Sequence, residues 1–140
     1  MDPIRLLQIR ETPLDVGETY AAVLGRESGG VALFVGTVRD HDDGREVLSL
    51  DYSAHPTAEA RLREVVDEVV AQHPVQAVAA VHRTGHLEIG DIAVIVAVAC
   101  AHRGDALTAC RQLIDELKSR VPIWKRQLFL EGGEEWVGTP

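Results

Sequence analysis

The chain has 140 residues, 46% of them hydrophobic and 26% charged, so we expect residues 1–140 to form a single globular domain with a sizeable core. The net charge of -8 at pH 7 argues against nonspecific nucleic-acid binding, which requires a basic surface. No segment has the length of a membrane span or the pattern of a signal peptide, and two cysteines form no disulfide framework, so we expect a cytoplasmic protein.

The first half of the chain alternates between strand and helix patterns. Residues 4–9 predict a strand, and Asp15 and Glu18 predict a capping box that starts a helix. The apolar positions of this helix are Val16, Tyr20, Val23 and Leu24. Residues 31–38 (VALFVGTV) predict a buried strand that a polar turn connects to a second strand, so residues 31–52 are typical of a hairpin.

The second half of the chain carries the clearest helix signals. One helix presents an apolar stripe formed by Ala58, Leu62, Val65, Val66 and Val69. A second helix, over about residues 105–120, should stop at Val121 because Pro122 disfavours helical geometry there. Strands are expected at residues 75–81, 92–101, 126–131 and 135–137. This order of elements predicts a single α+β domain whose sheet is mainly antiparallel.

Two of the expected strands end in a His-Arg pair, at residues 82–83 and 102–103, and Arg39 follows an earlier strand. The end of a strand holds a proton-transfer group in a fixed position beside an arginine that can bind an anion. The second pair also precedes the last helix, whose N-terminal amides can help to bind an anion. The residues alone support equally a structural reading, in which strands simply leave the core through polar side chains.

The segment 118–126 concentrates cationic side chains in an acidic chain. A helix stop before Pro122 lets the chain turn back and bring Lys125 close to Lys118, with Trp124 as a wall of the site; taken alone, Trp124 is more typical of a core aromatic. The structural alternative is that Lys118 is a helix-end lysine that interacts with the helix dipole. Lys125 is then a solvated charge at a strand edge.

No metal site is expected from the residue spacing. The segment 40–44 (DHDDG) lacks the spacing of a calcium loop, and the residues between His82 and His86 do not favour a helix that would pair them on zinc. Cys100 and Cys110 lie in apolar patterns. We expect both thiols to be buried.

Five segments of the chain resemble, in order and in spacing, the catalytic large subunit of molybdopterin synthase. They are FVGTVRDHDDG, VHRTGHLEIGD, CAHRGDAL, IDELKSRVPIWKRQ and EEWV. The resemblance covers nearly the whole chain, and LKSRVPIWKR together with the two His-Arg pairs is its most specific part. It implies an α+β fold of the α/β hammerhead type with a small additional β subdomain.

The resemblance implies a sulfurtransferase of molybdenum cofactor biosynthesis. Members of this family convert cyclic pyranopterin monophosphate (precursor Z) into molybdopterin by installing a dithiolene. The sulfur arrives as a thiocarboxylate on the C-terminal Gly-Gly tail of a small ubiquitin-like subunit. The family forms a homodimer of large subunits within a heterotetramer, and the resemblance implies neither a cofactor nor a metal.

The resemblance also implies roles for individual residues. The positions that match the active-site lysines are Lys118 and Lys125. The positions that match the phosphate contacts are Arg39, His102 and Arg103. The positions in matching substrate-contact segments are Thr37, Val38, Arg126 and Gln127. Our hypothesis is that Lys118 serves proton transfer while Lys125 orients the thiocarboxylate.

Two other functions are compatible with the residue identities. A non-catalytic module that binds a phosphorylated metabolite would use Arg39, Arg103 and Lys125 but would not need Lys118. A catalytically idle paralogue would only hold the small subunit. The chain departs from the family at Gln127, where Glu is frequent, and at residues 51–56 (DYSAHP), where an acidic and aromatic run is frequent.

Overall fold

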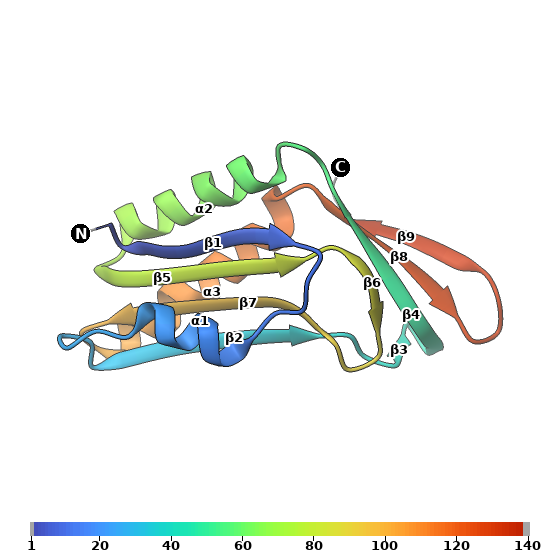
Figure 1. Cartoon of the computed structure of the whole chain (residues 1–140), viewed down its shortest axis with the longest axis horizontal. Coiled ribbons are helices and arrows are strands. Elements are labelled where there is room, and N and C mark those ends of the chain that lie inside the picture. Colours follow the sequence, from blue (N-terminus) through green and yellow to red (C-terminus); the bar gives the residue numbers. More distant parts are fainter. Residues whose placement is uncertain (1, 139–140) are drawn as a thin grey trace.

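The computed structural model describes residues 2–138, which form two sheets and three helices (Figure 1). The strands are β1 (Ile4–Arg10), β2 (Gly30–Thr37), β3 (His41–Asp42), β4 (Arg45–Ala54), β5 (Val75–Arg83), β6 (Gly85–Glu88), β7 (Ile92–Cys100), β8 (Ile123–Phe129) and β9 (Glu134–Gly138). The helices are α1 (Val16–Val23), α2 (Ala58–Gln72) and α3 (Arg103–Arg120). The expected α+β class is therefore confirmed.

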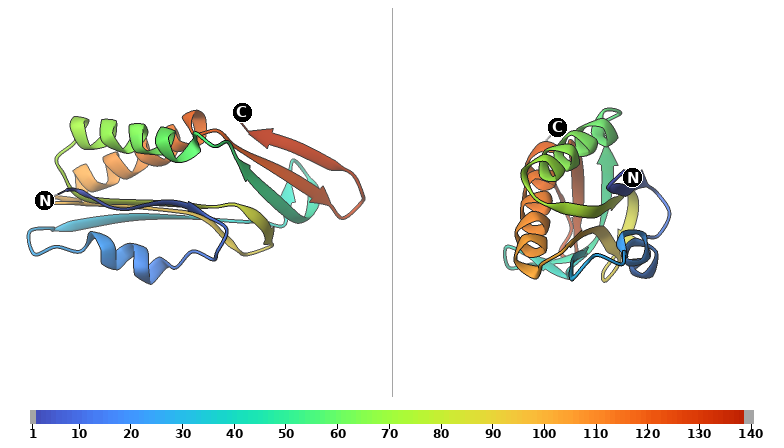
Figure 2. Two further views of the ribbon diagram at one scale, coloured as in Figure 1. Left: turned by 45° about the horizontal axis from the view of Figure 1, so that its top comes forward. Right: turned by 90° about the vertical axis from the view of Figure 1, so that its left-hand side faces the viewer.

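The first sheet has the strand order β1-β5-β7-β2, in which only β1 and β5 run parallel. Helices α2 and α3 cover one face of this sheet and α1 covers the other, which gives three layers (Figure 2). The central strands β5 and β7 are consequently buried on both faces. This double burial explains why their sequences are continuous apolar runs without polar alternation.

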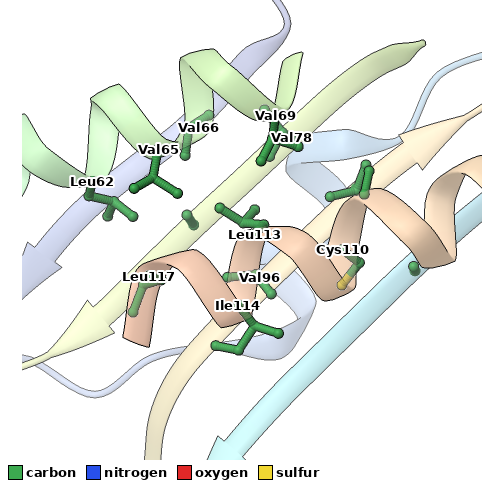
Figure 3. Close-up of a cluster of buried hydrophobic side chains, with 14 of the residues drawn as sticks. Leu62, Val65, Val66, Val69, Val78, Val96, Cys110, Leu113, Ile114 and Leu117 are labelled. Carbon is green, nitrogen blue, oxygen red and sulfur yellow. The ribbon is translucent and has the colours of Figure 1, made fainter. Parts of the chain in front are cut away.

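The main core lies between the first sheet and the helix pair α2–α3 (Figure 3). The helices contribute the side chains of Leu62, Val65, Val66, Val69, Cys110, Leu113, Ile114 and Leu117. The apolar stripe predicted for α2 is thus confirmed. Both cysteines are buried as free thiols, as expected. Within residues 2–138, no helix has the length and apolar character that crossing a membrane requires.

The second sheet extends from one end of the first (Figure 1) and has the order β3-β4-β8-β9, with β6 paired to β4. A small cluster of buried side chains, Val38, Leu50, Leu87 and Ala93, links this sheet to β7 of the first. Val38 directly follows β2, so the chain passes from one sheet to the other at this residue. Asp43 and Gly44 have positive φ angles of 51° and 78° and make the tight turn between β3 and β4.

The hairpin expected over residues 31–52 is wrong. Strand β2 pairs with β7 in the first sheet, whereas β4 pairs with β6 and β8 in the second. The hairpin that does form joins only β3 and β4. Strand β2 is also an edge strand, which leaves Leu33 and Phe34 exposed, so it is less buried than predicted.

The N-terminal helix also differs from the expectation in its details. Asp15 caps α1 by accepting a hydrogen bond of 2.8 Å from a backbone N–H. Glu18 pairs with Arg10 at 3.4 Å and makes no hydrogen bond back to the cap, so no capping box forms. Tyr20 is exposed, which breaks the predicted apolar face. The buried residues of α1 are Thr19 and Val23.

Leu113 lies fully buried between α3 and the first sheet (Figure 3), so its truncation should leave a cavity. We expect Leu113→Ala to lower the free energy of unfolding by about 3 kcal/mol. Leu107→Ala on the same helix is the matched control, because Leu107 is 61% exposed and should change it by less than about 0.5 kcal/mol. Urea denaturation measures both values, and similar losses would contradict this account of the core.

Candidate active site

A pocket of about 180 Å³ lies where the C-terminal end of α3 meets the second sheet. Its lining comes from β4, β5, α3, β8, β9 and the turn between α3 and β8, and consists of Tyr52, His82, Leu117, Lys118, Val121, Ile123, Lys125, Val137 and Gly138. Apolar walls with a few convergent polar groups are typical of sites that bind small molecules.

Lys118 and Lys125 share this pocket because α3 ends between them. The backbone N–H of Val121 still bonds to the carbonyl of Leu117 at 3.1 Å, as in a helix. Pro122 follows and the chain continues as β8 in a new direction. The turn therefore brings the two lysines together, as the sequence predicts.

Strand pairing then orients Lys125. On β8 it lies opposite Tyr52 of β4 and opposite Val137 of β9, and cross-strand neighbours have side chains on the same face of a sheet. All three line the pocket. The whole chain contains only two lysines, at positions 118 and 125, because its other twelve cationic residues among fourteen are arginines. Every lysine of this protein is thus in one pocket.

The environment of Lys118 disfavours its charged form. Partial burial lowers the pKa of Lys118, and the positive charge of Lys125 lowers it further. A lysine whose pKa is lowered carries an unprotonated amine more often at neutral pH, and that form can act as a base or nucleophile. Among residues 2–138, neither lysine forms an ion pair that would oppose this effect.

His82 and Tyr52 form the inner wall of the pocket. His82 is only 6% exposed, and burial lowers its pKa to about 4, with the charge of Lys118 acting in the same direction. The imidazole is therefore neutral at neutral pH. The ring of Tyr52 meets it edge-on, with centroids 4.9 Å apart and an interplanar angle of 84°. Burial raises the pKa of Tyr52, so its hydroxyl is also neutral.

Arg39 and Gln127 meet beside the pocket through Asp42. One carboxylate oxygen of Asp42 accepts a hydrogen bond of 2.8 Å from Gln127, and the other lies 3.2 Å from Arg39. The hydrogen bond from Gln127, with the charges of Lys125 and Arg39, lowers the pKa of Asp42. A glutamate at position 127 would instead place a second carboxylate against Asp42, so the departure from the family at Gln127 has a local reason.

Thr37 and Val38 occupy different environments at the end of β2. Thr37 is exposed. Val38 is 4% exposed and its backbone is already committed, since its N–H donates to Asp91 and its carbonyl accepts from Gly90. In this chain, Val38 therefore joins the two sheets, and its N–H is already used within the protein.

Arg126 and Trp124 point away from the lysine pocket. They alternate with Lys125 along β8 and so project from the opposite face of the strand. Arg126 bonds to Asp51 at 2.7 Å and lies 3.5 Å from Glu134. Trp124 is not among the residues that line the pocket, so the wall predicted for it is wrong.

His102 and Arg103 lie at the opposite end of α3 from Lys118. Fifteen residues separate Arg103 from Lys118, which is about 22 Å along a helix with a rise of about 1.5 Å per residue. Arg103 packs instead against Gly30 at the start of β2, where a Cβ on Gly30 would lie 2.9 Å from the Cα of Arg103. The structure therefore does not bring two of the three expected phosphate ligands, His102 and Arg103, together with the lysines of the same chain.

Two pocket residues with polar side chains, His82 and Tyr52, were not expected from the sequence as parts of this site. His82 carries a partial signal, because it belongs to a His-Arg pair at a strand end. Tyr52 carries none, because its position depends on the pairing of β4 with β8 and not on a local pattern.

The neutral state of His82 predicts a loss of stability in acid. In the unfolded chain its pKa is near 6.5, so between pH 6.5 and about 4 the unfolded state binds a proton that the folded state does not. Stability is therefore complete above pH 6.5 and falls as the pH drops through this window. Because Gln does not titrate, His82→Gln should reduce the acid-induced loss in the free energy of unfolding by about 3 kcal/mol. Urea denaturation of both proteins at pH 7, 5.5 and 4 measures the difference, and parallel pH profiles would contradict the prediction.

Comparison with known proteins gives a consistent result. A family model described as MoaE protein matches residues 9–120. Molybdopterin synthase catalytic subunit 1 of Mycobacterium tuberculosis is 43% identical over 132 residues, which cover 94% of this chain and 89% of the relative. The molybdopterin synthase catalytic subunit of Rattus norvegicus is 36% identical over 135 residues, which cover 96% of this chain and 68% of the relative.

Solved structures agree with these relatives. The X-ray crystal structure of molybdopterin synthase from Staphylococcus aureus matches with a TM-score of 0.88 and 34% identity, covering 94% of this chain and 96% of that chain. A complex of subunits 1 and 2 of molybdopterin-converting factor from Helicobacter pylori matches with a TM-score of 0.71 at 20% identity, covering 98% of this chain and 90% of that one, which supports the fold alone. The chain belongs to the MoaE family, whose curated members are catalytic subunits of molybdopterin synthase.

Proposed function

We propose that this chain transfers sulfur from the thiocarboxylated C-terminus of a small ubiquitin-like subunit to precursor Z, and so forms the dithiolene of molybdopterin. The observation that carries the proposal is the pocket in which both lysines of the chain meet. Membership of a family of molybdopterin synthase catalytic subunits supports it. A module that only binds a phosphorylated metabolite has no need of a lysine with a lowered pKa.

The two lysines take different parts in this reaction. Lys125 orients the anionic thiocarboxylate. Lys118, whose pKa burial lowers, exchanges protons with the pterin as each sulfur is added. The apolar side chains of Leu117, Val121 and Ile123 keep water away, which strengthens the electrostatic interactions inside the pocket.

The small subunit delivers its sulfur through an extended tail. A pocket of about 180 Å³ is too small for a globular partner, but it can accept the end of a chain. Glycine residues suit such a tail because they carry no side chain that would obstruct a narrow passage. The globular part of the small subunit then docks on the surface around the pocket.

A second copy of the chain completes each site. The pocket is smaller than the roughly 300–1,000 Å³ of typical ligand sites, and His102 and Arg103 lie at the far end of α3 from Lys118. In a homodimer, these two residues of one copy reach the lysine pocket of the other. The exposed edge strand β2, with Leu33 and Phe34 open to solvent, supports such pairing.

Removal of Lys118 should abolish product formation. We expect Lys118→Ala to lower the rate of molybdopterin formation from precursor Z by at least about a hundredfold, because it removes the proton-transfer group. Lys125→Ala should cause a severe loss. Arg111→Ala is the control on the same helix, since the side chain of Arg111 is 86% exposed in a weak pair with Asp115. Near-normal turnover by folded Lys118→Ala would favour the non-catalytic binding module.

Arg39 and Arg103 should recognise the phosphate of precursor Z. We expect Arg39→Ala and Arg103→Ala each to weaken binding by about tenfold or more, because a charge-assisted hydrogen bond is lost. The loss should shrink for an analogue without the phosphate. His102→Ala should act in the same direction. Calorimetry with both ligands measures the effects, and equal losses would show that these arginines do not bind phosphate.

Mixed dimers test whether the site is shared between copies. Lys118→Ala and Arg103→Ala should each be impaired alone, yet subunit exchange between them should restore about a quarter of the normal activity. Half of the dimers are then mixed, and each has one intact site. Activity that stays at the level of the separate variants after proven exchange would contradict a site shared between two copies.

A further inference from the structure

His82 faces the last turn of α3 because of its place on β5. Along this strand, Val78 and Ala80 project into the core beneath α2 and α3. His82 is the next residue in this alternation, so its side chain lies on the same face, at the end of the strand. It lines the pocket together with Lys118. The geometry of the sheet therefore directs the imidazole toward the helix end that carries the lysine.

The tautomer of His82 follows from its hydrogen bond. Its Nδ1 lies 2.7 Å from the backbone carbonyl oxygen of Arg83. A carbonyl oxygen can only accept, so Nδ1 carries the hydrogen and Nε2 carries the free lone pair. Nε2 has no hydrogen-bond partner among residues 2–138. It is also not among the side-chain nitrogen and oxygen atoms of these residues that lack a partner and are shielded from solvent. It is therefore open to the pocket.

An acceptor at this position complements the other polar groups of the pocket. The ammonium groups of Lys118 and Lys125 can only donate hydrogen bonds, and the hydroxyl of Tyr52 can donate or accept. Nε2 of neutral His82 can only accept. Burial keeps the imidazole neutral, since it lowers the pKa of His82 to about 4. A protonated imidazole would instead repel both lysines.

We propose that His82 is a positioning residue for Lys118, whose amine donates a hydrogen bond to Nε2 of the imidazole. The Arg83 carbonyl fixes the ring, and the ring then fixes the amine at the end of its flexible four-carbon chain. In the free chain, Lys118 and His82 line the same pocket but are not hydrogen-bonded to each other. Hydrogen bonds of this kind often form only when a ligand fills the site. The role of the fixed amine in sulfur transfer rests on the proposed function.

The two-lysine composition allows a direct test. Protein labelled with ¹³C-lysine gives one set of signals for each lysine, and Lys125→Arg assigns them. The pKa of Lys118 is measured by titration in His82→Phe, which keeps an aromatic ring, and in His82→Gln, whose amide oxygen can replace Nε2. The titrations are made on the free protein and on its complex with the small subunit in its carboxylate form.

We expect His82→Phe to lower the pKa of Lys118 in the complex, because the ammonium loses an acceptor while its burial is kept. Its kcat should fall by about tenfold, with little change in the KM for precursor Z. His82→Gln should keep the pKa and stay within about threefold of the normal kcat. His82→Asn, whose amide N–H can donate to the Arg83 carbonyl but whose short side chain places no acceptor at the position of Nε2, replaces the Phe variant if that protein does not fold.

An unchanged Lys118 pKa and kcat in folded His82→Phe would overturn the proposal. Equal damage in His82→Gln and His82→Phe would do the same, because it would show that only the shape of the ring matters. The titration needs no turnover. If His82→Phe shifts the pKa of Lys118 but the unmodified protein makes no molybdopterin, the contact with His82 stands and the proposed synthase function is wrong.

Discussion

The turn at Val121 and Pro122 is the constraint on which the site depends. Val121 is 2% exposed, and its carbonyl accepts a hydrogen bond of 2.9 Å from the backbone of Ile123. The carbonyl of Pro122 accepts another, of 3.0 Å, from the backbone of His55. These bonds fix where α3 ends and where β8 begins. A shift of one residue in β8 would turn Lys125 to the opposite face of the sheet, so the register of this strand decides which cation enters the pocket.

Acidic side chains pair with the arginines near the second sheet and leave the two lysines without such a partner. Asp42 pairs with Arg39, and Asp51 pairs with Arg126, so both arginines already have a carboxylate partner. Lys118 and Lys125 make no ion pair among the described residues. An acidic protein can therefore keep two lysines side by side without a carboxylate partner, and burial, with the charge of Lys125, lowers the pKa of Lys118.

The sequence predicts the features that depend on neighbouring residues. The stripe on α2, the end of α3 before Pro122 and the approach of Lys118 to Lys125 all follow from periodicity or from a single proline. Strand pairing does not, because the partners of β2 and β4 lie far along the chain. For the same reason, the sequence could not show which of the adjacent residues Lys125 and Arg126 faces the pocket. The family resemblance names His102 and Arg103 without stating how far they lie from the lysines within one copy.

The confinement of both lysines to one pocket also determines how this protein responds to chemical damage. Reactive acyl groups, cyanate and sugar aldehydes modify amines, and in most proteins they are absorbed by many surface lysines of little importance. Here the surface cations are arginines, so apart from the N-terminal amine the targets of such reagents are the two side chains of the pocket. Modification of a single lysine in this chain therefore falls in the pocket that we propose as its active site.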